Sequence, residues 1–300
     1  MKRNVIRRRL IEPKSTADGD PEPRDGGVQS VDRALSILET LAEDDEGYRL
    51  SDLAVRTGLS TSTVHRLLAT LEKRHFVQFD RTESKWHVGA QSFAVGATFA
   101  RRRNFVAQAM PYLRKLRDQT RETANLAVVD DESIIVLTRM ESREIMRSLT
   151  KVGGRVAMVA SGVGKAVLAT YSDEDINAII CRQGMPRLTE KSIVRASDLF
   201  REIEAIRRQG YAVDDEEARM GLRCVAAVVY NDCSEPLAAI SVSGMTSRVT
   251  EDRIPALGRT VREVAAELTA ALGGVMPDAA DDVEAKRAEP DAPNPTFSSR

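Results

Sequence analysis

Short hydroxyl side chains and an arginine lie close together near residue 60, in an order that suits contact with DNA. Residues 60–63 are Ser-Thr-Ser-Thr, and His65 and Arg66 follow within one helical turn. Small side chains at the start of a helix let the backbone approach phosphate, and arginine can pair with guanine N7 and O6. The residues that we expect to face the major groove of double-stranded DNA are Ser60, Thr61, Ser62, Thr63, His65 and Arg66.

Two short helices joined by a tight turn are predicted to position these side chains. Ser51 can cap the first helix and Ser60 the second, and Gly58 lies where a left-handed residue would end the first. The second helix carries an apolar stripe at helical spacing, formed by Val64, Leu67, Leu68 and Leu71. A helical hairpin with a solvated polar face is the alternative, because such patterns often occur by chance.

The flanking segments favour the DNA-binding interpretation. Residues 30–43 predict an amphipathic helix whose apolar side is Val31, Ala34, Leu35, Leu38, Leu41 and Ala42. Residues 76–80 and 85–88 predict two strands around a turn at residues 81–84. Three helices and a hairpin make a winged helix, in which Arg81 and Lys85 on the wing can reach phosphate or the minor groove.

The rest of the chain predicts a helical connector followed by an α+β domain. In the connector, the three arginines at 101–103 break the helical pattern, and Pro111 is expected to start a second helix that packs against its copy in a dimer. The predicted strands are 124–129, 133–138, 211–214, 225–230 and 237–243. The predicted helices are 161–170, 173–181, 197–209 and one from a Thr250 cap to residue 272. Hairpins interleaved with helices indicate an antiparallel sheet.

These patterns predict five parts: a disordered tail (1–27), a winged helix-turn-helix (28–88), a helical linker (89–122), an α+β domain (123–274) and a disordered acidic tail (275–300). Aromatic residues make up only 4% of the chain, which argues against stacking platforms for single-stranded nucleic acid. Three cysteines without a CxxC predict reduced thiols and a cytoplasmic location. The histidines lack metal-site spacing and no apolar run approaches ~20 residues, so we predict no metal, no cofactor and no membrane span.

A second candidate site begins at Ser161-Gly-Val-Gly164, which opens a helix. Free N–H groups and the positive end of the helix dipole at such a turn favour a carboxylate. A phosphate loop is excluded, because Val159 stands where the Walker pattern needs glycine and Ala166 replaces its Ser or Thr. Lys165 is therefore expected to pack its stem and keep its charge at the rim.

Several segments together resemble the IclR family of bacterial transcription regulators. The matching stretches are residues 28–38 (VQSVDRALSIL), 58–68 (GLSTSTVHRLL), 160–168 (ASGVGKAVL), 215–227 (DEEARMGLRCVAA) and 239–244 (AISVSG). The resemblance covers about residues 28–274. It implies a winged helix, a GAF-like effector domain, homodimers or homotetramers, and inverted-repeat operators.

The C-terminal half is most similar to the glyoxylate-responsive members of the family. That resemblance implies an effector site at Gly162, Val163, Asp214, Leu222, Cys224, Ser241 and Ser243. Asp215 is adjacent to Asp214 and is the alternative at that position, and residues 149–158 match more loosely. Ser241 and Ser243 alternate along one strand, so both hydroxyls point to the same face.

Three hypotheses follow. The first is a DNA-binding regulator controlled by a small 2-oxo acid, glyoxylate first of all. The second keeps the regulator and changes the effector to an aromatic or longer dicarboxylic acid. The third is an enzyme that uses Cys224 on a small oxo acid, and it is disfavoured because the domain has no histidine to act as its base; otherwise Cys224 is a small wall of the site or a buried core thiol. We therefore predict no catalytic residue.

Overall fold

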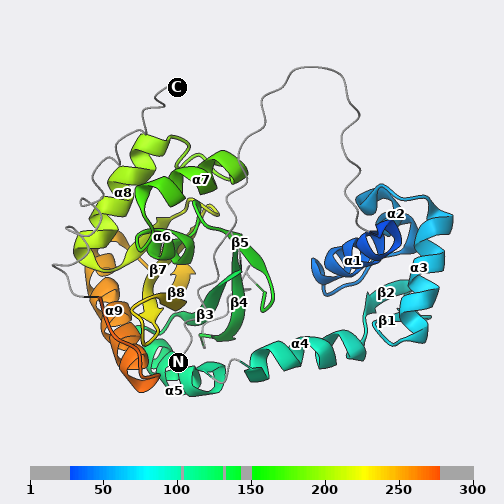
Figure 1. Ribbon diagram of the computed structural model, residues 1–300, viewed down its shortest axis with the longest axis horizontal. Coiled ribbons are helices and arrows are strands. Elements are labelled where there is room, and N and C mark those ends of the chain that lie inside the picture. The colour runs from blue at the N-terminus through cyan, green and yellow to red at the C-terminus, as the bar shows by residue number, and fades with distance from the viewer. Residues whose placement is uncertain (1–27, 103–104, 131–132, 143–150, 278–300) are drawn as a thin grey trace, which may run out of the picture. The chain divides into compact units, whose positions relative to one another are not determined.

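The computed structural model of the chain describes residues 28–102, 105–130, 133–142 and 151–277 (Figure 1). The chain divides into two compact units, one ending at Phe93 and the other beginning at Ala94. The predicted tail 1–27 and residues 278–300 of the predicted tail 275–300 lie outside the described residues, and the division into five parts stays a prediction. Residue 275, predicted to begin the acidic tail, is attached to the body, since the Val275 N–H donates to the Asn231 carbonyl at 2.9 Å.

The first unit is a three-helix domain with a β-hairpin, as predicted. Its elements are α1 (Gln29–Ala42), α2 (Leu50–Thr57), α3 (Thr61–Lys73), β1 (Val77–Asp80) and β2 (Lys85–Val88). Gly58 has a φ of +66° and ends α2, and the Ser60 hydroxyl accepts the Thr63 N–H at 3.3 Å, which caps α3. The buried core is formed by Ile37, Leu41, Leu53, Val64, Leu68, Val77 and Trp86. Leu67 and Leu71 pack partly buried against it.

Two local predictions in this unit are wrong. Arg49, not Ser51, occupies the N-cap of α2, and the Ser51 hydroxyl instead donates to the Asp52 carboxylate at 3.2 Å. The apolar side of α1 is also shifted: Val31 and Leu35 are 55% and 52% exposed, Ala42 is exposed, and Ile37 is fully buried. The reason is tertiary, because Ile37 and Leu41 supply the core that α1 shares with the other helices and the hairpin.

The connector consists of α4 (Ala90–Arg102) and α5 (Phe105–Thr120), and here two predictions fail. The helix runs through Arg101 and Arg102, and Pro111 lies inside α5 and does not begin it. One apolar stripe crosses the proline, formed by Phe105, Ala109, Leu113 and Leu116, and it is buried in the second unit. Packing of this stripe offsets the N–H that proline removes from the helix.

The second unit is built on a six-stranded antiparallel sheet in the order β5-β4-β3-β8-β7-β6. The strands are β3 (Thr123–Asp130), β4 (Ser133–Met140), β5 (Arg155–Ala157), β6 (Ala212–Asp215), β7 (Leu222–Tyr230) and β8 (Pro236–Met245). The short edge strand β5 was not predicted from the sequence. The predicted hairpins β3-β4 and β7-β8 are confirmed.

Helices cover both faces of this sheet (Figure 1). On one face, α6 (Gly162–Leu168), α7 (Asp173–Gln183) and α8 (Ala196–Gln209) share a core with the sheet. On the other, α5 and α9 (Ile254–Ala271) share a second core. Thr250 precedes a 3-10 turn (Glu251–Arg253) and makes no side-chain cap, so its predicted capping of the last helix is wrong. No helix in the described ranges is long and apolar enough to cross a bilayer.

Candidate functional site

The polar face of α3 presents the predicted DNA-contacting residues. Thr61, Ser62, His65 and Arg66 are exposed, and Thr63 is half-buried. The Ser60 hydroxyl lies 3.1 Å from the Ser62 hydroxyl and 2.8 Å from the Thr63 hydroxyl. These contacts hold the side chains of the first turn against the helix, so that a phosphate can come close to the backbone. Arg66 lies one turn further along the same helix.

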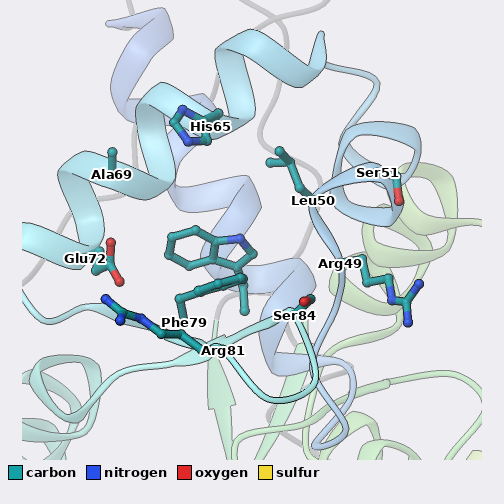
Figure 2. Close-up of a pocket in the computed structure, with 10 residues that line it drawn as sticks. Arg49, Leu50, Ser51, His65, Ala69, Glu72, Phe79, Arg81 and Ser84 are labelled. Atoms are coloured by element: carbon teal, nitrogen blue, oxygen red, sulfur yellow. The ribbon is translucent and has the colours of Figure 1, made fainter.

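A groove of about 650 Å³ lies between α3, the wing and the start of α2 (Figure 2). Its lining combines cationic, hydroxyl and apolar side chains with the carboxylate of Glu72; the residues are Arg49, Leu50, Ser51, His65, Ala69, Glu72, Phe79, Arg81, Ser84 and Trp86. The rings of Phe79 and Trp86 have centroids 4.9 Å apart and form its apolar part. Arg81, predicted from the sequence as a wing contact, is in this lining and is exposed.

Arg49 belongs to this groove and was missed by the sequence reasoning. The Tyr48 and Trp86 backbones exchange hydrogen bonds of 3.1 and 2.8 Å, which joins the segment before α2 to the wing. No side-chain hydrogen bond or ion pair of Arg49 occurs within the described residues. Lys85 is less free than predicted, because it is ion-paired with Glu83 at 2.9 Å, and that contact raises the pKa of Lys85.

The seven residues predicted to bind an effector come together between one face of the sheet and the start of α6. We call them the α6 cluster (Gly162, Val163, Asp214, Leu222, Cys224, Ser241 and Ser243). Strand register aligns Asp214 with Cys224 and Cys224 with Ser243 across three strands. Leu222 and Ser241 lie two residues from Cys224 and Ser243 on the same strands, and therefore on the same sheet face. A Cβ placed on Gly162 would lie 3.2 Å from the Cys224 carbonyl and 3.3 Å from its sulfur, so the start of α6 lies directly over this row.

Two backbone amides at the start of α6 have no acceptor among the described residues. The Ser161 hydroxyl accepts the Gly164 N–H at 3.1 Å, and the Ser161 carbonyl accepts the Lys165 N–H at 2.9 Å. The N–H groups of Gly162 and Val163 find no acceptor in the part of the chain that the structure describes. Unpaired amides at a helix start are the groups that bind carboxylates and phosphates.

Asn125 is a polar neighbour that the sequence reasoning did not include. This residue lies on β3 opposite Ser241, and its side-chain amide donates to the Ser241 hydroxyl at 3.3 Å and to the Ser243 hydroxyl at 3.1 Å. Because each serine oxygen accepts from Asn125, each serine hydroxyl can still donate its own O–H. The side chain of Ser241 also hydrogen-bonds Cys224, which opposes the effect of burial on the pKa of that thiol.

The structure also separates the two adjacent aspartates. Asp214 is 4% exposed, and its Oδ1 accepts the Glu217 N–H at 2.8 Å and the Ala218 N–H at 3.3 Å. Burial, with the charge of Glu217, raises the pKa of Asp214 to about 6. Asp215 points to the opposite side of β6, where it pairs with Arg223 and Lys191. Asp214 is therefore the aspartate that faces the α6 cluster.

The chemistry of Cys224 does not suit a nucleophile. Desolvation, with the charge of Asp214, raises the pKa of the Cys224 thiol to about 12. A thiol with that pKa stays protonated at neutral pH, whereas the thiolate is the reactive form. The protonated thiol of Cys224 therefore suits a passive wall of the α6 cluster and not a nucleophile.

The predicted position of the Lys165 charge at the rim is wrong. The side chain is fully buried, pairs closely with Glu217 Oε1, and lies 3.4 Å from Glu202 Oε1 on α8. A helix packed over α6 closes the route by which the lysine stem would reach water. Burial raises the pKa of Glu217 and the charge of Lys165 opposes that shift. Glu217 Oε2 is the one buried side-chain nitrogen or oxygen atom without a hydrogen-bond partner in the described chain.

Comparison with known proteins agrees with this architecture. The model of the bacterial transcriptional regulator IclR C-terminal domain matches residues 97–270, and that of the IclR helix-turn-helix domain matches residues 30–81. The chain belongs to the IclR family. Within this family it is 41% identical over 254 residues to the acetate operon repressor of Salmonella typhimurium, covering 84% of this chain and 93% of the relative. It is 34% identical over 256 residues to the repressor AllR of Escherichia coli strain K12, with 85% and 94% covered. Among solved structures, Thermotoga maritima IclR superposes with a TM-score of 0.66 at 25% identity, covering 82% of this chain and 99% of that one.

Membership of the IclR family assigns a role to each unit. The first unit is the DNA-binding domain and the second is the effector-binding domain of a transcription regulator. The family and its named relatives are regulators and not enzymes, which agrees with the protonated Cys224 thiol.

Proposed function

We propose that this chain is a repressor that binds an inverted-repeat operator as a homodimer or homotetramer and responds to a small 2-oxo acid, glyoxylate first of all, at the α6 cluster. The observation that carries the proposal is the pair of unpaired amides at Gly162 and Val163, which lie over the row Asp214, Cys224 and Ser243. The names of the relatives, an acetate operon repressor and the repressor AllR, support repression as the output.

The acid is held from two sides. Its carboxylate accepts the N–H groups of Gly162 and Val163. Its other oxygens accept the O–H of Ser243 and the O–H of Ser241, which turns from Cys224 to the acid. Charge-assisted hydrogen bonds of this kind contribute roughly 1.5–3 kcal/mol each. Buried Met158 and half-buried Leu222 leave less room for an aromatic or longer dicarboxylic acid, which is the alternative effector class.

On the DNA side, α3 enters the major groove and Arg66 pairs with a base edge. The groove beside the wing takes the sugar-phosphate backbone, with Arg49 and Arg81 contacting phosphates. Arg56 offers a contrast, because its charge is already engaged by Glu43 at 2.8 Å.

Coupling between the two units is mechanical in this proposal. The acid binds one arrangement of the two chains of a dimer more tightly than another. Through α4 and α5, a change of arrangement alters the distance between the two α3 helices. The shift in operator affinity cannot exceed the difference in acid affinity between those arrangements.

The test is the double variant Ser241→Ala/Ser243→Ala. We expect it to lose the response to glyoxylate and to keep operator binding in the absence of acid, measured by fluorescence anisotropy with labelled DNA. Ser247→Ala, an exposed serine just after β8, is the control and should respond like the unmodified chain. A double variant that still responds fully would refute the site, and one that loses operator binding as well would indicate misfolding, which circular dichroism detects.

A further inference from the structure

Four ionisable side chains meet beside the α6 cluster, and their charges do not balance. Lys165 is the one cation of the four. It is fully buried and paired with Glu217 and, at 3.4 Å, with the half-buried Glu202. Asp214 adds a further carboxyl, 4% exposed. With every group in its charged form, three carboxylates face one ammonium, two of them buried.

Two carboxyl oxygens in this group have no hydrogen-bond partner in the part of the chain that the structure describes. Glu217 Oε1 is taken by Lys165, and Glu217 Oε2 is buried without one. Asp214 Oδ1 accepts two backbone amides, and no donor to Asp214 Oδ2 exists within the described ranges. Strand register places Asp214 in the row with Cys224 and Ser243, next to the unpaired amides of α6.

Among the described residues, the neighbours of Asp214 supply no positive charge besides that of Lys165. The thiol of Cys224 on β7 stays protonated, and Ser243 on β8 and Asn125 on β3 are neutral. The loop after β6 contributes Glu217, α6 contributes Lys165, and α8 contributes Glu202 through Lys165.

On the opposite side of β6, Arg223 and Lys191 are already ion-paired. Arg223 and Lys191 pair with Asp215, and Lys191 pairs also with Glu216. The site already holds more carboxylates than cations. A carboxylate that enters the α6 cluster therefore adds one more negative charge to that excess.

We propose that the α6 cluster accepts monocarboxylates in preference to dicarboxylates, and binds each one together with a single proton carried by Asp214. This inference rests on the proposed function, in which the acid binds at the cluster. The carboxylates of the ligand and of Asp214 repel each other in a site that excludes water. Protonation of Asp214 removes this repulsion. Once protonated, Asp214 Oδ2–H donates to an oxygen of the acid, which turns a repulsion into a hydrogen bond.

The direction of the pH dependence follows from the same contacts. Without ligand, the pKa of Asp214 is about 6, so the group is mostly ionised at neutral pH. A bound carboxylate raises that pKa further, so binding takes up a proton. The affinity for the acid then rises up to tenfold for each pH unit from 8 down to about 6, and levels off below, where Asp214 is already protonated.

The experiment is calorimetry of glyoxylate with the full chain at neutral pH, in phosphate and in Tris, whose ionisation heats differ. The difference in binding heat gives the number of protons exchanged, and we expect an uptake close to one. Asp214→Asn keeps an oxygen for the two backbone amides and offers an N–H in place of the O–H. It should therefore bind glyoxylate with no proton uptake and no pH dependence. Glu202→Gln removes a neighbouring negative charge of the same network and should retain the uptake.

Oxalate, a dicarboxylate of the same length as glyoxylate, tests the selectivity. We expect at least tenfold weaker binding to the unmodified chain, because a second charge needs a second proton. Glyoxylate binding with no proton uptake, or oxalate binding as tight as glyoxylate, would overturn the inference and leave the proposed function standing. Absence of heat with every small acid would instead overturn the proposed function. If Asp214→Asn does not fold, the two-buffer comparison on the unmodified chain still decides.

Discussion

Replacement of Lys165 by methionine tests the buried ion pair that joins α6 to the loop after β6. Methionine is unbranched and one heavy atom shorter than lysine, and it carries no charge, which leaves the Glu217 carboxylate buried without its cation. Removal of one partner from a buried pair costs about 3–5 kcal/mol. We expect the lower end of that range, because Glu217 can limit the cost by taking up a proton.

The pH dependence of this variant has a definite sign. Burial already raises the pKa of Glu217, and loss of Lys165 raises it further. A carboxyl whose pKa is higher in the folded than in the unfolded state favours folding at low pH, and this contribution is lost as pH rises through the folded pKa. The deficit of Lys165→Met should therefore be largest above neutral pH and shrink towards acid pH. The double variant Lys165→Met/Glu217→Gln should recover part of it at neutral pH.

The chain offers an internal control for the assay, because Trp86 is its only tryptophan and lies in the first unit. Thermal unfolding followed by tryptophan fluorescence reports that unit, and far-ultraviolet circular dichroism reports both. A loss of about 3 kcal/mol in a unit of this size lowers the midpoint by roughly 6–12 °C. We expect that drop in the circular dichroism transition and none in the fluorescence transition. A shift of less than about 2 °C, or a deficit that grows as pH falls, would contradict the buried pair.

Three further predictions concern the first unit. Arg49→Gln should reduce the slope of log affinity against log salt by about one without changing the preference for operator over random DNA, whereas Arg56→Gln should leave the slope unchanged. Arg66→Ala should weaken operator binding by ~1–3 kcal/mol while random DNA binds as before, and equal weakening of both in an anisotropy titration would refute a base contact. Ser60→Ala should lower the stability reported by Trp86 fluorescence by ~0.5–2 kcal/mol, and an unchanged midpoint would show that the cap is dispensable.

Much of the fold could be predicted because its signals are local. Gly58 and Ser60 end and begin helices through their own backbone and side-chain chemistry, and the structure confirms both. The β3-β4 and β7-β8 hairpins follow from β-branched runs with polar turns between them. The α6 cluster was found through a family resemblance, and strand register explains why residues so far apart in sequence meet.

The predictions that failed depend on tertiary contacts. The exposure of Val31 and Leu35 reflects which half of α1 the neighbouring elements cover, and Pro111 stays inside a helix because the apolar stripe on either side of it is buried. Lys165 was predicted at the rim, because neither the burial of Glu217 nor the position of α8 is visible in the residues around it. The residues around Arg49 do not indicate that it lies beside the wing, because the backbone pairing of Tyr48 with Trp86 brings it there.

The central claim is that a small acid at the α6 cluster changes how the winged helix binds DNA. The direct test is an anisotropy titration of the full chain against an operator selected from random sequence, with and without millimolar glyoxylate. We predict a weaker apparent affinity for the operator in the presence of glyoxylate, with no such change for Ser241→Ala/Ser243→Ala. Identical titration curves with and without the acid, in a preparation that calorimetry shows to bind it, would contradict the claim.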